Sequence, residues 1–269
     1  MAEEIYIKKI EDIIGVVLDQ KYDVRIDRHR SSFLYRGLPN DSFTLTTSIE
    51  RNCKEKWTDL EKPILRNFTK YAAMHMPDLK DSVWKQLIIG QHHGLPTRLL
   101  DWTYSPLIAM HFATSGEHLH EMDEHNGLIW KIDIEELNLL LPQKYQEALN
   151  REKAYLFTTD MMRNVVHDLE SYDKDMSDQS MVFLEPPSFD ERIINQYSYF
   201  SVVPKNIGCI EDFLDKYTHK TVKYIIDKDL RWEIRDMLDR LNINERIIFP
   251  DLDGLSNWLK RHYFVKESR

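Results

Sequence analysis

The chain has 269 residues, of which 42% are hydrophobic and 30% are charged, so it is long enough for one large domain or two small ones. Its formal net charge of −9 argues against extended nucleic-acid binding, which needs a broad basic surface. No apolar run approaches the ~20 residues that span a bilayer, and the amino terminus lacks a signal-peptide pattern. Two distant cysteines form neither a disulfide framework nor a metal-ligand motif. We therefore expect a cytoplasmic protein without membrane segments.

The first elements are read from the spacing of apolar and aromatic residues. Apolar positions at helical spacing predict a helix over residues 3–20. A short aromatic run predicts a strand over residues 32–37, which ends in Gly37 before a turn. Residues 42–49 are rich in Ser and Thr, and they are expected to form a loop or a short strand.

Two helices are expected next. Thr58 and Glu61 resemble a capping box at the start of a helix, although Pro63 leaves that start ambiguous. A second helix is expected over residues 78–89, with Trp84 and its apolar neighbours turned inward.

The segment from Gln91 to Ala113 combines a polar loop with the start of an apolar helix. Gly94 and Pro96 favour an irregular backbone in its first half, which carries two histidines, an arginine, an aspartate and a tryptophan. Ser105 can cap the helix that follows, and Pro106 suits the first helical position because it has no N–H to lose. We therefore expect a functional loop that is fixed to the core by the helix it feeds.

In the second half of the chain, helices and strands follow one another without regular alternation. Strands are expected over residues 128–132, 182–184, 199–203, 222–226 and 247–249, and helices over 230–241 and 255–263. Residues 135–180 are mixed and charged, and we expect a flexible insertion there. This irregular order argues against a doubly wound parallel sheet and predicts a single α+β domain over residues 1–269.

Arg36 and Gly37 are the first candidate site residues. An arginine at a strand end can bind a ribose or an anion, and a neighbouring glycine lets a ligand approach the main chain. The alternative is an ordinary salt-bridged arginine before a turn. Arg98 and Asp101 are close enough in sequence to pair and fix the shape of the polar loop.

Four residues suggest a metal site or a general base: His92, His93, Asp101 and His111. A metal needs three or four convergent ligands, and adjacent histidines rarely reach one ion together. His111 also fits a helix core. A histidine base beside Asp101 is conceivable, but the sequence shows no nucleophile for it. No metal is therefore expected, and a metal-assisted hydrolase is kept as a third hypothesis.

Several motifs together resemble the FRG domain family. Phe33-Leu-Tyr-Arg36-Gly37 is similar to its aromatic-Arg-Gly motif, and Gln91 to Thr103 with Ser105-Pro106 and Phe112-Ala113 is similar to its longest signature. Further similarities lie at Arg192-Ile with Gln196 and Phe200, and at Phe249 to Gly254-Leu. The chain has Ser198 where the family often has glycine, which leaves the local turn in question.

The order of these motifs resembles that of ADP-ribosyltransferases, which implies a split mixed sheet with amino-terminal helices packed around it. The resemblance implies that Arg36 binds the ribose or phosphate of NAD, that the Gly37 main chain holds the nicotinamide amide, and that Gln196 occupies the place of a late catalytic glutamate. The implied catalytic residues are Arg36, Asp101 and Gln196. The implied NAD-binding residues are Tyr35, Arg36, Gly37, Gln91, His92, His93, Arg98, Trp102, Ser105 and Phe200.

The expected function is therefore an NAD-consuming ADP-ribosyltransferase-like enzyme that acts as a toxin or in phage defence and modifies a protein target. Cleavage of the nicotinamide–ribose bond develops positive charge on the ribose, which a carboxylate stabilises. Neutral Gln196 supplies no such charge. Either Asp101 or another carboxylate acts instead, or the reaction is slow, or the domain is a non-catalytic module that binds a nucleotide or ADP-ribose.

Overall fold

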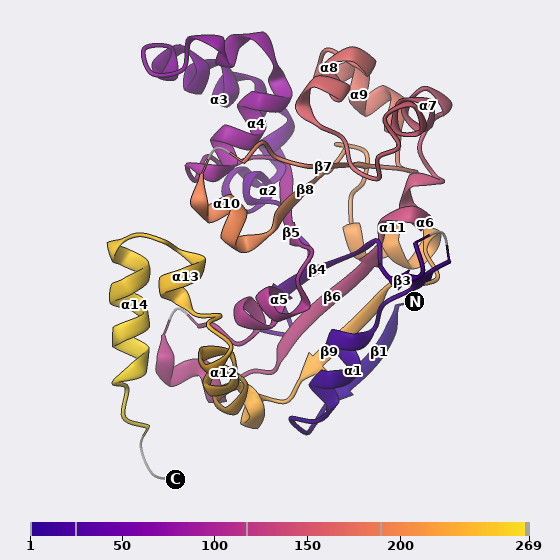
Figure 1. Cartoon of the computed structure of the whole chain (residues 1–269). Helices are drawn as coiled ribbons and strands as arrows, with labels where there is room; N and C mark the ends of the chain where they lie inside the picture. The colour runs from indigo at the N-terminus through magenta and orange to yellow at the C-terminus, as the bar shows by residue number, and fades with distance from the viewer. Residues whose placement is uncertain (1, 25, 117, 189, 267–269) are drawn as a thin grey trace.

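A mixed seven-stranded sheet runs through the computed structural model of the chain, which describes residues 2–24, 26–116, 118–188 and 190–266 (Figure 1). The strand order is β1-β9-β6-β4-β5-β8-β7. β1 pairs with β9 in parallel, and the other neighbours are antiparallel. The strands are β1 (Glu3–Ile7), β4 (Phe33–Leu38), β5 (Leu99–Thr103), β6 (Gly127–Asp133), β7 (Val182–Leu184), β8 (Ser198–Val202) and β9 (Val222–Ile226).

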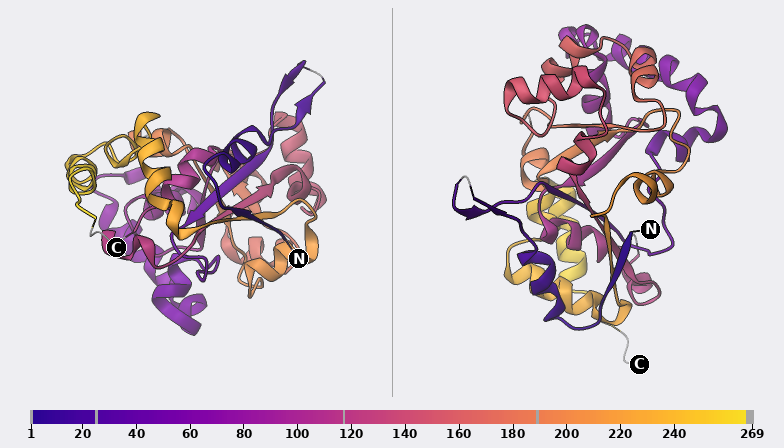
Figure 2. Two further views of the ribbon diagram at one scale, coloured as in Figure 1. Left: turned by 90° about the horizontal axis from the view of Figure 1, so that it is seen from below. Right: turned by 90° about the vertical axis from the view of Figure 1, so that its right-hand side faces the viewer.

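Helices cover this sheet, which confirms the expected α+β class. They are α1 (Asp12–Leu18), α2 (Ser48–Cys53), α3 (Trp57–Ala72), α4 (Val83–His92), α5 (Pro106–Ala113), α6 (Ile134–Asn138), α7 (Gln143–Glu152), α8 (Thr159–Val165), α9 (Leu169–Met176), α10 (Glu191–Gln196), α11 (Ile210–Tyr217), α12 (Arg231–Arg240), α13 (Glu245–Ile248) and α14 (Leu252–His262). A small hairpin of β2 (Tyr22–Asp23) and β3 (Arg28–His29) projects from the body (Figure 2). None of the helices within the described ranges is long and apolar enough to cross a bilayer.

The sheet has a weak joint between β4 and β5. These strands pair at one position, Tyr35 with Thr103, whereas β4 pairs with β6 from Phe33 to Leu38 and β5 pairs with β8 from Leu99 to Thr103. We call this joint the seam. It divides the sheet into a half made of β1, β9, β6 and β4 and a half made of β5, β8 and β7, which lie in different parts of the molecule (Figure 1).

Three hydrophobic clusters follow the alternation of side chains along the strands. One face of both halves packs as a single cluster that includes Leu34, Trp102 and Trp130. The opposite face carries two clusters: one packs β4, β6 and β9 against α1, α5 and α12, and the other packs β5, β7 and β8 against α3, α4 and α7 to α9. On this face, the helices that cover one half of the sheet therefore form a different layer from those that cover the other half, and the seam is the boundary between them.

The predicted start of α5 is confirmed. The Ser105 side chain accepts a hydrogen bond from the Ile108 amide, and Pro106 occupies the first turn. β4, β6, β7, β8 and β9 are also found within a residue or two of their expected ranges, as is α12. The carboxyl-terminal α14 is found as well, but it begins three residues earlier than expected. Trp84 is fully buried as expected, although α4 extends to His92 and so takes in Gln91, which was expected in the loop.

Four local expectations were wrong. Residues 3–7 form an edge strand and not the start of a helix, because they add to β9. The capping box is formed by Thr47 and Glu50 at α2, while Glu61 is buried inside α3. The expected loop contains β5, and the expected strand at 247–249 overlaps α13. Residues 191–196 form α10, and β8 begins at Ser198.

Residues 135–180 form four helices, α6 to α9, although the sequence indicates no regular element there. Tyr145, Met162 and Tyr172 are fully buried in the cluster that also contains Trp84. Helices α6 to α9 are short, and each has few apolar residues among many charged ones, so the apolar spacing typical of a helix is difficult to recognise in the sequence. The flexibility of this segment, and a single domain over residues 1–269, stay predictions.

Candidate functional site

A pocket of about 260 Å³ lies at the seam, and it brings together residues from three distant parts of the chain. Arg36 and Gly37 come from β4, Gln91 from α4, Asp101 from β5, and Gln196 from the end of α10. These are residues that the sequence placed in one site. We call this cavity the seam pocket.

The Arg36 guanidinium spans the seam. Its Nη1 donates to the Asp101 carbonyl oxygen at 2.5 Å and lies 3.6 Å from the Asp101 carboxylate. Its side chain is only 16% exposed, and Nε finds no hydrogen-bond acceptor among the described residues. Burial lowers the pKa of Arg36, the Asp101 carboxylate opposes that shift, and the like charge of Arg51 adds to it. An anion or a polar ligand oxygen that bound here would stabilise the buried guanidinium charge.

Asp101 is the single carboxylate among the described residues that line the seam pocket. Its side chain is 54% exposed and accepts a hydrogen bond from Gln91 Nε2 at 2.9 Å. The other end of the Gln91 amide accepts from the Thr97 hydroxyl at 2.7 Å, which fixes the amide orientation. The carboxylate is thus held at the pocket surface with an open side toward solvent.

Gln196 ends α10 and is half-buried. Its Nε2 donates to the Ile248 carbonyl at 3.3 Å, and its main-chain carbonyl oxygen accepts from the Thr103 hydroxyl at 2.7 Å. The left-handed residue that turns α10 into β8 is Tyr197, with φ 49°, so Ser198 takes an ordinary strand position without needing to be glycine. The side-chain amide places a neutral group at the pocket edge.

A second cavity of about 490 Å³ shares Arg36 with the seam pocket. It is lined by Arg51 and by the hydroxyl residues Ser42, Thr44 and Thr46, and no carboxylate is among its described lining residues. Arg51 Nη1 donates to the Thr46 carbonyl, which holds its side chain over this loop. Two guanidinium groups with hydroxyls and no acid suit a phosphate group.

Gly37 has a packing role that the sequence did not predict. A Cβ atom at this position would lie 1.9 Å from the Ala109 carbonyl oxygen and 2.7 Å from the Ala113 nitrogen. The absence of a side chain therefore lets α5 pack directly on β4. A contact between a ligand and the Gly37 main chain stays a prediction.

Arg98 does not pair with Asp101, which corrects that expectation. Residues three apart near a strand point to opposite faces, and Arg98 is buried at 3% exposure. Its Nε donates to Glu61 at 2.7 Å, and its Nη1 donates to Asp173 at 2.5 Å. Burial alone would lower the pKa of Arg98, but its bonds to the two carboxylates raise it. Arg98 joins α3, β5 and α9 and does not line the seam pocket.

The structure places the three candidate histidines apart from Asp101, with other partners. His92 pairs with Asp190 at 3.4 Å, and His93 is exposed with its ring against that of His92. His111 is buried, and its Nδ1 lies 2.7 Å from Arg235. The described residues contain no cluster of three potential ligands. The neighbours of Asp101 are Arg36 and Gln91, so the arrangement also offers no histidine base at that carboxylate.

Of the remaining expected residues, Tyr35 and Trp102 line the seam pocket, whereas Ser105 and Phe200 do not. Tyr35 lines it and is otherwise buried in the core, and burial raises the pKa of its hydroxyl. Trp102 contributes to the wall, but its indole nitrogen donates to Ser201 inside the sheet. Ser105 caps α5 and lines a different cavity, and Phe200 is buried in the core.

The sequence reasoning missed several residues at the site. Thr103, Phe112, Arg192 and Ser198 line the seam pocket, and Arg51 lines the cavity beside it. Phe112 and Arg192 belong to segments that carried the motifs. Arg51 gave no signal, because its approach to Arg36 depends on how α2 and its preceding loop fold back.

Comparison with known proteins supports the first two motifs. A family model described as FRG domain matches residues 31–122, a range that contains Arg36, Gly37 and the segment from Gln91 to Ala113. This match confirms the resemblance over those residues. The motif at Arg192 to Phe200 and the one at Phe249 to Gly254 lie outside it. No curated protein and no solved structure matches the chain.

Proposed function

We propose that the seam pocket binds a nucleotide with ribose and phosphate groups, and that this nucleotide is NAD, because residues 31–122 match the FRG domain model. The observation that carries the proposal is the Arg36 guanidinium, which is largely buried, lacks an acceptor for Nε among the described residues, and borders both cavities. Phosphate oxygens fit between Arg36 and Arg51, and ribose hydroxyls fit the oxygens and amides of Asp101, Gln91 and Gln196.

We further propose that the protein is an ADP-ribosyltransferase-like enzyme. The reaction breaks the bond between the nicotinamide nitrogen and ribose C1, and a nucleophile then attacks C1 and gives up its proton. Asp101 is the carboxylate that can stabilise the positive charge on the ribose, since it lines the pocket and half of its side chain is exposed. The seam supports the proposed split sheet. The role as a toxin or defence effector follows from the resemblance alone.

A non-catalytic binding module is the second candidate, and two observations favour it. Asp101 already faces the Arg36 and Gln91 side chains, which offset its negative charge. Gln196 is neutral, and its Nε2 is engaged with the Ile248 carbonyl. In this case the domain retains NAD or ADP-ribose without cleaving it.

Replacing Arg36 with alanine is expected to weaken the binding of NAD and ADP-ribose by about 10- to 100-fold, because charge-assisted hydrogen bonds to the guanidinium are lost. Isothermal titration calorimetry of both ligands measures this change. The control is Arg151→Ala, which removes an exposed arginine on α7. Wild-type protein that gives no heat with either ligand, or equal affinities for wild type and Arg36→Ala, rejects the proposed site.

Replacing Asp101 with asparagine separates the enzyme from the binding module. For the enzyme, nicotinamide release from NAD is expected to fall by about 10²- to 10³-fold, as for other losses of preorganised charge at a reacting centre. The affinity for ADP-ribose should change much less, because asparagine keeps one oxygen and the size of the side chain. Chromatographic assay of nicotinamide measures the rate. Wild-type protein that binds NAD without releasing nicotinamide favours the binding module instead.

A further inference from the structure

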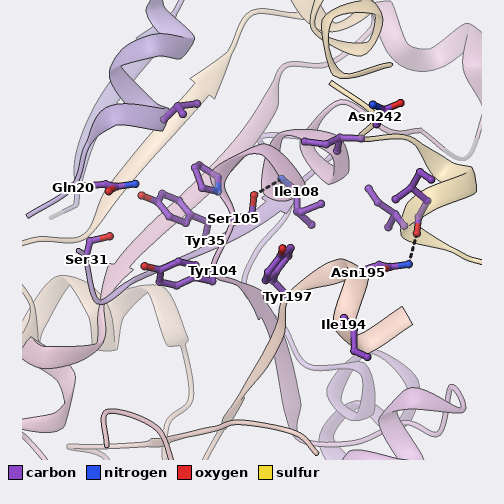
Figure 3. Close-up of a pocket in the computed structure, with 15 residues that line it drawn as sticks. Gln20, Ser31, Tyr35, Tyr104, Ser105, Ile108, Ile194, Asn195, Tyr197 and Asn242 are labelled. Atoms are coloured by element: carbon purple, nitrogen blue, oxygen red, sulfur yellow. Dashed lines mark hydrogen bonds between the residues drawn. The ribbon is translucent and has the colours of Figure 1, made fainter. Parts of the chain in front are cut away.

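A larger cavity of about 570 Å³ lies beside the start of α5, and it carries no charged side chain among its described lining residues (Figure 3). The surrounding elements are α1, the end of β5, α10, and the segment from Asn242 to Ile248. The lining offers no counter-charge, so it does not suit an ionised ligand. We call it the tyrosine pocket.

Three tyrosine rings line this pocket. Tyr35 reaches it from β4, Tyr104 follows β5, and Tyr197 follows α10 (Figure 3). The Tyr104 amide donates to the Tyr197 carbonyl at 3.3 Å, so the two rings are carried by segments held together through the backbone. Tyr104 is 38% exposed and Tyr197 is 57% exposed, which leaves ring surface available to a ligand.

The backbone of Tyr197 is held in an unfavourable conformation. Its φ of 49° lies in the left-handed region, which glycine adopts freely and a bulky side chain adopts at a cost. A glycine would make the turn from α10 into β8 more easily. An aromatic residue kept in such a conformation at the rim of a cavity points to a role for its ring beyond the turn itself.

Amide and hydroxyl groups complement the rings. Gln20 and Ser31 lie near the hydroxyl ends of Tyr35 and Tyr104 (Figure 3), and Asn195 and Asn242 lie toward the opposite end. The Asn195 side-chain nitrogen donates to the Ile247 carbonyl at 2.7 Å, which fixes that amide at the wall. Flat aromatic surface with neutral donors and acceptors around it matches a planar heterocycle better than a purely apolar molecule.

We propose that the tyrosine pocket binds an uncharged nucleobase, with its ring against Tyr104 and Tyr197 and its edges toward the amides. The tyrosine pocket and the seam pocket share Tyr35 as a lining residue, so they adjoin. The base has two possible sources: the nucleotide whose phosphate lies at Arg36, or a separate nucleoside. The first source rests on the proposed function, whereas the second does not.

The test is the binding of the uncharged nucleosides adenosine, inosine and cytidine to the 269-residue wild-type protein, Tyr197→Gly and Tyr197→Phe, measured by calorimetry. Glycine suits the left-handed backbone, so Tyr197→Gly is expected to keep or raise the melting temperature while it weakens binding about tenfold or more. Phenylalanine keeps the ring and should bind nearly as tightly as the wild type. Tyr71→Ala, which removes a 74% exposed ring on α3, is the matched control and should change nothing.

Competition distinguishes the two sources of the base. A base that belongs to the nucleotide at Arg36 makes ADP-ribose displace the nucleoside, whereas a separate nucleoside binds together with ADP-ribose. Adenosine that binds while NAD does not leaves this proposal standing and rejects the proposed function. Wild-type protein that binds none of the three nucleosides, or Tyr197→Gly that binds them as tightly as the wild type, overturns the proposal.

Discussion

Replacing Gly37 with alanine is expected to lower the free energy of unfolding by at least about 3 kcal/mol, because the new Cβ atom would overlap the backbone of α5. The atoms in its way are the Ala109 carbonyl oxygen at 1.9 Å and the Ala113 nitrogen at 2.7 Å. Neither can rotate away as a side chain does. Relief requires α5 to move off β4, yet the start of α5 is fixed by the Ser105 cap and Pro106.

Urea unfolding followed by circular dichroism measures this loss. Gly15→Ala is the matched control, because a Cβ atom there has no neighbour within 4 Å and Gly15 lies inside α1. Alanine favours a helix, so this control should be as stable as the wild type or more stable by up to about 1 kcal/mol. If Gly37→Ala unfolds at the wild-type urea concentration but no longer binds NAD, the glycine serves the ligand and the packing explanation fails.

Replacing Arg98 with methionine is expected to cost about 3–5 kcal/mol of stability, because it leaves two carboxylates buried without their cation. Glu61 and Asp173 are exposed by only 5% and 2%, and both accept hydrogen bonds from this guanidinium. Methionine keeps much of the length and volume of the arginine stem, so the loss reports the ion network more than a cavity. Thermal and urea unfolding provide the measurement.

The triple variant Arg98→Met, Glu61→Gln, Asp173→Asn is the control for this interpretation. It removes the stranded charges together with the arginine, and a large part of the lost stability should return. The family resemblance places Arg98 at the NAD site, which makes the opposite outcome informative. A single variant that unfolds like the wild type but binds NAD poorly would show that Arg98 contacts the ligand.

Features set by neighbouring residues were predictable from the sequence, and features set by tertiary pairing were not. The start of α5 follows from Ser105 and Pro106 alone, because capping depends on one turn of chain. β5 was missed because a run of Leu99, Leu100, Asp101 and Trp102 beside Pro96 lacks the clean alternation of a strand. Its place in the sheet comes from pairing with β8, about 100 residues further along the chain.

The same distinction holds for the candidate site. The convergence of Arg36, Asp101 and Gln196 was expected from the resemblance and is found at the seam pocket. The partners of Arg98 were wrong, because sequence proximity suggested Asp101 while the fold supplies carboxylates from α3 and α9. A buried arginine pairs with the acidic residues that the tertiary structure places beside it, and these cannot be identified from their spacing along the chain.

The weak joint in the sheet has a consequence for affinity. Where β4 and β5 diverge, the Asp101 carbonyl accepts a hydrogen bond from the Arg36 side chain at 2.5 Å, which links the two strands beyond their single pair at Tyr35 and Thr103. An anion that binds in the seam pocket would compete for the Arg36 guanidinium. Its binding would therefore weaken the hydrogen bond between Arg36 and Asp101, which links the two halves of the sheet. Breaking the hydrogen bond between Arg36 and Asp101 then reduces the net binding free energy, unless the ligand contacts both halves of the sheet and replaces that bond.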